Sequence, residues 1–175
     1  MAPAHSRALL NPDMTRVVLC SRIGDEEPHE DAQIRTKLLD RASGYLSSFQ
    51  WCNQILESYF GLGVGRFVAV FLFRIQPTRP EVDEWLWVIV GDLPPAYIVT
   101  EQTPNPACAL KAYIVLMRQW VEGVMKGESV EDLIPVNVEP DVTWAAELQG
   151  RLNLLEAELL PDYIDDLRAC EDLDL

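Results

Sequence analysis

The chain has 175 residues, of which 49% are apolar, enough for one globular domain with a sizeable core. No uncharged apolar run approaches the ~20 residues of a membrane span, and the N-terminal residues lack the apolar core of a signal peptide. We therefore expect a cytoplasmic protein that forms a single domain over residues 1–175, with loose tails at residues 1–14 and 171–175.

The formal net charge of −14 is concentrated near the C-terminus, because residues 128–175 contain 14 acidic and 2 basic side chains. Nucleic-acid binding needs Lys and Arg for the phosphates, and an anionic membrane surface needs the same cations. The charge therefore argues against both kinds of partner and favours a basic protein partner. The alternative is that the acidic faces only keep the protein soluble.

The four cysteines, Cys20, Cys52, Cys108 and Cys170, form no CxxC pair, and the two histidines lie at no metal-ligand spacing from other ligands. In a cytosolic chain we expect free thiols, with Cys52 and Cys108 buried as small apolar residues. We expect no metal and no cofactor.

The N-terminal third predicts a short strand at 16–20 and then a long helix at about 31–60. Its apolar side chains recur every three or four residues, the helical period: Ile34, Leu38, Ala42, Tyr45, Leu46, Phe49, Cys52, Leu56 and Phe60. Gly61, Gly63 and Gly65 are then expected to end the helix and lead into a strand. This order is unlike a phosphate-binding loop, which follows a strand and opens a helix.

A three-strand antiparallel meander is predicted at about 66–75, 84–90 and 96–100, with turn chemistry at 91–95 (GDLPP). Both faces of the first two strands are apolar, whereas a sheet with one wet face alternates apolar with polar residues. Helices or a partner chain must therefore cover both faces, and a second copy forming a homodimer is one way to do so.

Two C-terminal helices are predicted, at about 106–126 and 143–160. Asn105 is a suitable N-cap, Pro106 suits the first helical turn, and Gly127 suits the C-terminal cap. Leucines at heptad-like spacing run along the second helix. The expected fold class is α+β, with the meander packed by the N-terminal helix and these two helices.

The candidate binding residues form two groups. Trp and Tyr are frequent anchors of protein interfaces, and the first group surrounds the predicted turn: Trp85, Trp87, Asp92, Pro94, Pro95 and Tyr97. The alternative for Trp85 and Trp87 is a place in the core. The second group is acidic: Glu156, Asp162, Asp165 and Asp166.

Two functions remain open. The first is a small acidic, non-catalytic protein-binding module of the adaptor, chaperone or immunity/antitoxin type, engaging a basic partner. The second is a small-molecule-binding protein or enzyme with a pocket between sheet and helices near Asp92, Tyr97, Asn105 and Cys108. In that case Cys108, in the first turn of a helix whose dipole lowers a thiol pKa, is the candidate nucleophile.

The predicted order of helix, three-strand meander and helix resembles two known architectures at the level of element order. One is that of small acidic secretion chaperones, which dimerise and bind effectors. The other is that of ubiquitin-conjugating folds, with a Pro-Pro before a strand. In the second case Thr103-Pro104-Asn105 stands where the His-Pro-Asn motif of that family is expected.

Overall fold

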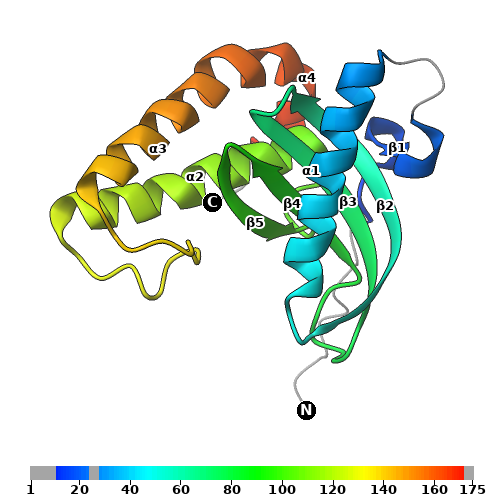
Figure 1. The fold of residues 1–175 in the computed structure, drawn as a ribbon, viewed down its shortest axis with the longest axis horizontal. Coiled ribbons are helices and arrows are strands. Elements are labelled where there is room, and N and C mark those ends of the chain that lie inside the picture. The colour runs from blue at the N-terminus through cyan, green and yellow to red at the C-terminus, as the bar shows by residue number, and fades with distance from the viewer. Residues whose placement is uncertain (1–10, 24–27, 172–175) are drawn as a thin grey trace.

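A computed structural model describes residues 11–23 and 28–171. Its centre is one antiparallel sheet in which the five strands lie side by side in the order in which they occur in the chain (Figure 1). The strands are β1 (Val18–Leu19), β2 (Cys52–Val64), β3 (Val68–Pro77), β4 (Trp85–Gly91) and β5 (Leu93–Val99). The predicted three-strand meander is therefore the β3–β4–β5 part of a five-stranded sheet.

Helix α1 (His29–Ser47) covers one face of this sheet and lies in front of it in Figure 1. Its inward side chains Leu38, Ala42 and Leu46 are buried against alternate residues of the two central strands. These sheet residues are Ala69, Phe71, Phe73, Ile75, Leu86, Val88 and Val90.

Helix α2 (Pro106–Lys126) covers the opposite face, where the complementary set of strand residues points: Val68, Val70, Leu72, Trp87 and Ile89. Asn105 caps the helix by accepting a hydrogen bond from the Cys108 N–H at 2.9 Å, and Gly127 ends it in the left-handed conformation with φ of 70°. Both predicted caps are confirmed. Helices α1 and α2 thus cover the apolar residues of β3 and β4 from both sides of the sheet.

The C-terminal segment lies outside the three layers formed by α1, the sheet and α2, and it packs along α2. It begins with α3 (Val142–Leu154), whose Asp141 cap accepts a hydrogen bond from the Trp144 N–H, and continues as a π-helical turn η3 (Leu155–Leu159). Short helical turns follow: η4 (Leu160–Tyr163), α4 (Ile164–Leu167) and η5 (Arg168–Cys170). The predicted helix at 143–160 is confirmed in place, and its leucines Leu148, Leu152, Leu155 and Leu159 are buried.

The predicted helix at 31–60 is wrong in its second half. The helix ends at Ser47, and residues 52–64 form β2, which pairs with β3 along its length. The expected strand at 16–20 is reduced to the two residues of β1, flanked by 3-10 turns at Met14–Arg16 and Cys20–Arg22. The predicted tails lie mostly outside the described residues.

The glycines after Phe60 do not end a helix. Gly61 lies inside β2, and a Cβ there would be 2.6 Å from the Cβ of Pro106, so this glycine lets the first turn of α2 approach the strand. The predicted turn at 91–95 is shorter than expected, because Leu93 already begins β5. Pro94 and Pro95 are compatible with this position, since β5 is an edge strand that pairs only with β4.

Candidate functional site

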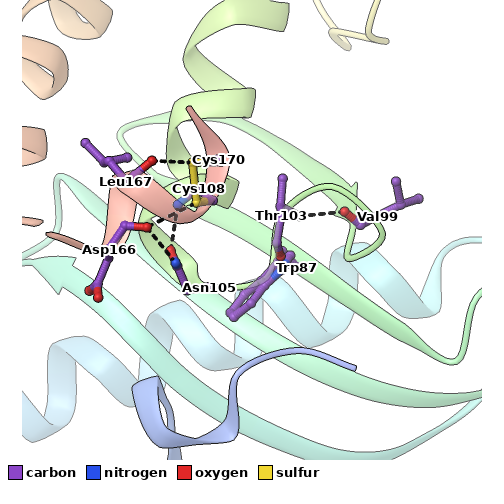
Figure 2. The surroundings of a disulfide bond; sticks show 8 residues. All are labelled: Trp87, Val99, Thr103, Asn105, Cys108, Asp166, Leu167 and Cys170. Atoms are coloured by element: carbon purple, nitrogen blue, oxygen red, sulfur yellow. Dashed lines mark hydrogen bonds between the residues drawn. A yellow bond between two sulfur atoms is a disulfide. The ribbon is translucent and has the colours of Figure 1, made fainter. Parts of the chain in front are cut away.

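Trp85 and Trp87 lie on the same strand face, as predicted, and this is the face covered by α2. Trp87 is completely buried, and its indole Nε1 donates a hydrogen bond to the Thr103 carbonyl at 2.7 Å (Figure 2). Trp85 is half-buried beside the ring of Tyr59 and under the guanidinium of Arg74. Trp87 is therefore a core residue, and only Trp85 retains a solvent-facing part.

The rest of the predicted turn cluster does not join these tryptophans. Tyr97 pairs with Val88 across the strands and lies on the α1 face of the sheet. There its ring contacts Phe49 and Trp51 edge-on, at centroid distances of 5.4 and 5.2 Å. The six predicted residues are thus divided between the two faces of the sheet and do not form one surface.

Pro94 and Asp92 have different surroundings again. The Pro94 carbonyl is buried and accepts a hydrogen bond from the Tyr113 hydroxyl at 2.7 Å. Burial also raises the pKa of the Tyr113 hydroxyl far above its ordinary value, so this tyrosine is a neutral donor that ties α2 to β5. Asp92 is exposed at the β4–β5 turn, and its backbone N–H donates to the Phe67 carbonyl.

Cys108 and Asn105, the other residues of the predicted pocket, are buried at the start of α2, where they connect this helix to the C-terminal segment. Cys108 forms a disulfide with Cys170, so the expectation of four free thiols is wrong for these two residues. Asn105 donates from Nδ2 to the Asp166 carbonyl at 2.9 Å, which fastens the same C-terminal segment from a second point (Figure 2). Cys108 therefore has a structural role here, because a sulfur in a disulfide has no thiolate to act as a nucleophile.

This disulfide also bears on the predicted location. Disulfides persist in oxidising compartments and are rare in the cytosol. Cys20 and Cys52 remain free and half-buried, and burial is the main cause that raises the pKa of both thiols. The bond between Cys108 and Cys170 therefore weighs against a cytosolic location.

Three of the four predicted acidic residues are already paired. Glu156 on η3 accepts two hydrogen bonds from Arg118 on α2, from Nη1 to Oε1 at 2.8 Å and from Nη2 to Oε2 at 2.6 Å. This hydrogen-bonded pair lowers the pKa of the Glu156 carboxyl. Asp166 contacts Arg16 at 2.8 Å and Asp165 contacts Arg168 at 3.2 Å. Asp162 alone among the four is exposed without an ion pair in the described chain.

Other carboxylates of the same region are exposed and form no ion pair with any described residue. They lie on the loop between α2 and α3, on α3 and on η3, and we call them with Asp162 the acidic face: Glu131, Asp132, Glu139, Glu147, Glu158 and Asp162. In Figure 1 these elements form the side of the molecule that lies away from α1.

The described chain also has two hollows on either side of the β4–β5 turn. The first, of about 510 Å³, lies between α1 and the β2–β3 turn and is lined by Glu30, Gln33, Ile34, Lys37, Leu38, Arg41, Arg66 and Asp92. The second, of about 390 Å³, lies between the same turn and the C-terminal layer. Its lining is Arg41, Gly91, Asp92, Leu93, Pro94, Pro95, Val136, Asn137, Val138, Trp144 and Arg151.

The two hollows meet at Arg41 and Asp92, and neither is lined by Tyr97, Asn105 or Cys108. Of the four predicted pocket residues, Asp92 alone lines these two hollows. Sequence reasoning missed the cations Lys37, Arg41, Arg66 and Arg151, because they come from three distant segments that only the fold brings together. The available signal was that almost all basic residues precede residue 128.

Within residues 11–23 and 28–171, no group of three His, Cys, Asp or Glu side chains is placed to hold a metal ion. In the same residues no helix combines the length and apolar character needed to cross a membrane. Comparison with models of protein families, with curated proteins and with solved structures gave no match.

Proposed function

We propose that the chain is a non-catalytic protein-binding module whose acidic face engages a basic protein partner. The observation that supports this function is the exposure of its six carboxylates, none of which forms an ion pair within the described chain. An unpaired surface carboxylate keeps its full negative potential, and several on one side of a molecule attract and orient a basic partner.

The proposal no longer rests on all the residues that the sequence singled out. Glu156 and Asp166 are paired with Arg118 of α2 and with Arg16, and Asp165 is paired with Arg168 of its own segment, so each of these charges already has a cation beside it. Asp162 and its neighbours on the acidic face take their place. A single exposed ion pair contributes at most about 1 kcal/mol, so a specific partner must engage several of these carboxylates together.

The test compares two variants of equal net charge. One carries Glu147→Gln, Glu158→Gln and Asp162→Asn in the acidic face. The control carries Asp40→Asn, Glu81→Gln and Asp83→Asn, which remove the same charge from α1 and the β3–β4 loop. Each protein is immobilised and exposed to extract of the native host at low and at high salt.

We expect the wild type and the control to retain a basic protein in stoichiometric amount at low salt and to release it at high salt, because screening weakens exposed ion pairs. The acidic-face variant should retain much less of it. Equal retention by both variants, or no retained protein at any salt concentration, would contradict the proposed function.

A further inference from the structure

The two hollows beside the β4–β5 turn form one continuous surface with a charge opposite to that of the molecule. Four cations border it: Lys37 and Arg41 of α1, Arg66 of the β2–β3 turn, and Arg151 of α3. Only two acids, Glu30 and Asp92, line the same surface. We call this surface the cationic groove; it is locally positive on a chain whose formal net charge is −14.

The cations of the groove are available to a ligand. In the described chain, Lys37, Arg66 and Arg151 form no ion pair and no side-chain hydrogen bond, although Glu30 and Asp92 lie on the same surface. Arg41 donates from Nη1 to the Gly91 carbonyl, which fixes its guanidinium beside the turn. A guanidinium has five N–H donors, so most of those of Arg41 remain free for another acceptor.

One end of the groove is apolar. Leu93, Pro94 and Pro95 of β5 form one wall, and Val136, Val138 and Trp144 of the C-terminal layer form the facing wall. Leu93 and Pro94 are buried, so the apolar surface that a ligand can reach comes from Pro95, Val136, Val138 and Trp144. The occupant should therefore bring both negative charge and apolar side chains.

We propose that the cationic groove binds an acidic peptide segment of another protein, in which carboxylates alternate with apolar residues. The two hollows share Arg41 and Asp92 in their linings, so an elongated chain that passes these two residues contacts both hollows. In an extended peptide successive side chains point to opposite sides. Carboxylates can thus face Lys37, Arg41 and Arg66 while apolar side chains enter the hollow beside Trp144.

This inference goes beyond the proposed function, because it concerns a different surface with the opposite charge. The probe is a fluorescently labelled peptide of alternating Glu and Leu, with a Gln–Leu peptide of the same length as the uncharged control. Fluorescence anisotropy measures the dissociation constant of each peptide with the full chain at low salt.

A groove variant carries Lys37→Gln, Arg66→Gln and Arg151→Gln, none of which removes an ion pair or side-chain hydrogen bond within the described chain. A matched control carries Arg22→Gln, Arg79→Gln and Lys111→Gln, which remove the same charge outside the groove. We expect the Glu–Leu peptide to bind the groove variant about fivefold more weakly for each cation removed, the scale of a partly exposed ion pair. The control variant should bind the peptide nearly as well as the wild type.

Asp92 provides a second test of the charge of the ligand. Its carboxylate is exposed at the junction of the two hollows, so it repels an acidic ligand and attracts a basic one. Asp92→Asn should therefore tighten binding of the Glu–Leu peptide by a factor of about two to five. Weaker binding by this variant would overturn the proposal.

Three further outcomes would also overturn it. One is a wild-type protein that does not distinguish the Glu–Leu from the Gln–Leu peptide. Another is displacement of the peptide by millimolar inorganic phosphate to the same extent as by unlabelled peptide, which assigns the groove to a small anion. The last is peptide binding that appears only after Asp172→Asn and Asp174→Asn, which assigns the groove to the chain's own acidic end.

Discussion

Gly91 shows how much one residue contributes to the shape of the cationic groove. Its φ is +147°, a conformation that side-chain-bearing residues rarely adopt, and a Cβ there would lie 2.2 Å from the Phe67 carbonyl oxygen. Its own carbonyl accepts the hydrogen bond from Arg41. The close approach of the two hairpin turns and the orientation of Arg41 thus depend on the absence of a side chain at residue 91.

We therefore expect Gly91→Ala to lower the free energy of unfolding by about 3 kcal/mol or more, since it introduces both backbone strain and a contact with the backbone of Phe67. Gly150→Ala is the matched control. Gly150 lies on the exposed side of α3, and a Cβ there would meet nothing within 4 Å, so the substitution should raise the stability by about 0.5–1 kcal/mol. Urea denaturation measures both, and equal effects would refute the assigned conformation of Gly91.

At the scale of elements, the sequence predicts those helices and strands in which apolar periodicity and capping residues indicate the same boundaries. Helix α2 has an apolar stripe, an N-cap at Asn105 and a C-terminal glycine at Gly127, and all three are confirmed. Strands β3 and β4 are apolar on both faces because α1 and α2 cover them, which explains the lack of alternation. That both faces are covered was thus predicted, whereas the choice between a helix of the same chain and a partner chain for the second face was left open.

Strand β2 escaped prediction because of its irregular pairing. Its register with β3 shifts between Cys52 and Gln54, between Ile55 and Glu57, and between Phe60 and Leu62. Each β-bulge adds a residue and changes the side to which the following residues point. On the α1 face the bulges leave Cys52, Ile55 and Phe60 at spacings of three and five, whereas the four-residue spacing of Cys52, Leu56 and Phe60 continued the stripe of α1 in the sequence.

The different environments of Leu46 and Leu56 test whether α1 ends before β2 begins. A continuous helix over 31–60 would bury both, whereas the structure buries Leu46 completely and leaves Leu56 45% exposed at the register shift between Ile55 and Glu57 of β2. Leu46→Ala should cost about 2–5 kcal/mol of stability, and Leu56→Ala less than about 1 kcal/mol. Chemical denaturation of the two variants measures the difference, and similar losses would favour the continuous helix.

On the scale of the whole molecule, the candidate site could be predicted only in part. Asp92 and Asp162 do lie at the surfaces now proposed to bind partners. The cationic groove was not predictable, because Lys37, Arg66 and Arg151 are distant in sequence and carry no motif. The disulfide was not predictable either, since four scattered cysteines allow six different single disulfides and give no signal to choose among them.

The Cys108–Cys170 bond closes a loop with a sequence separation of 62 residues and holds the C-terminal layer to the start of α2. Such a cross-link restricts the unfolded chain, and for this loop length it should contribute about 4 kcal/mol to stability. We expect the Cys108→Ala/Cys170→Ala variant to unfold at lower urea concentration than the wild type by a corresponding amount.

Reduction provides the control for this prediction. Dithiothreitol should destabilise the wild type and leave the double variant unchanged, because only the wild type has a bond to reduce. Titration of thiols in the unfolded, unreduced wild type should find those of Cys20 and Cys52 alone. A full set of four thiols under these conditions would refute the disulfide.

The position of the disulfide also sets the order in which the protein can mature. Cys170 is the last of the four cysteines to leave the ribosome, whereas Cys20, Cys52 and Cys108 are synthesised earlier and can react with one another first. The sulfur of Cys108 lies against the C-terminal segment, where it contacts the Asp166 carbonyl and is bonded to Cys170, so this segment is part of what buries it. Until Cys170 is synthesised, oxidation of Cys108 can only pair it with a wrong cysteine, and thiol–disulfide exchange must later undo that bond.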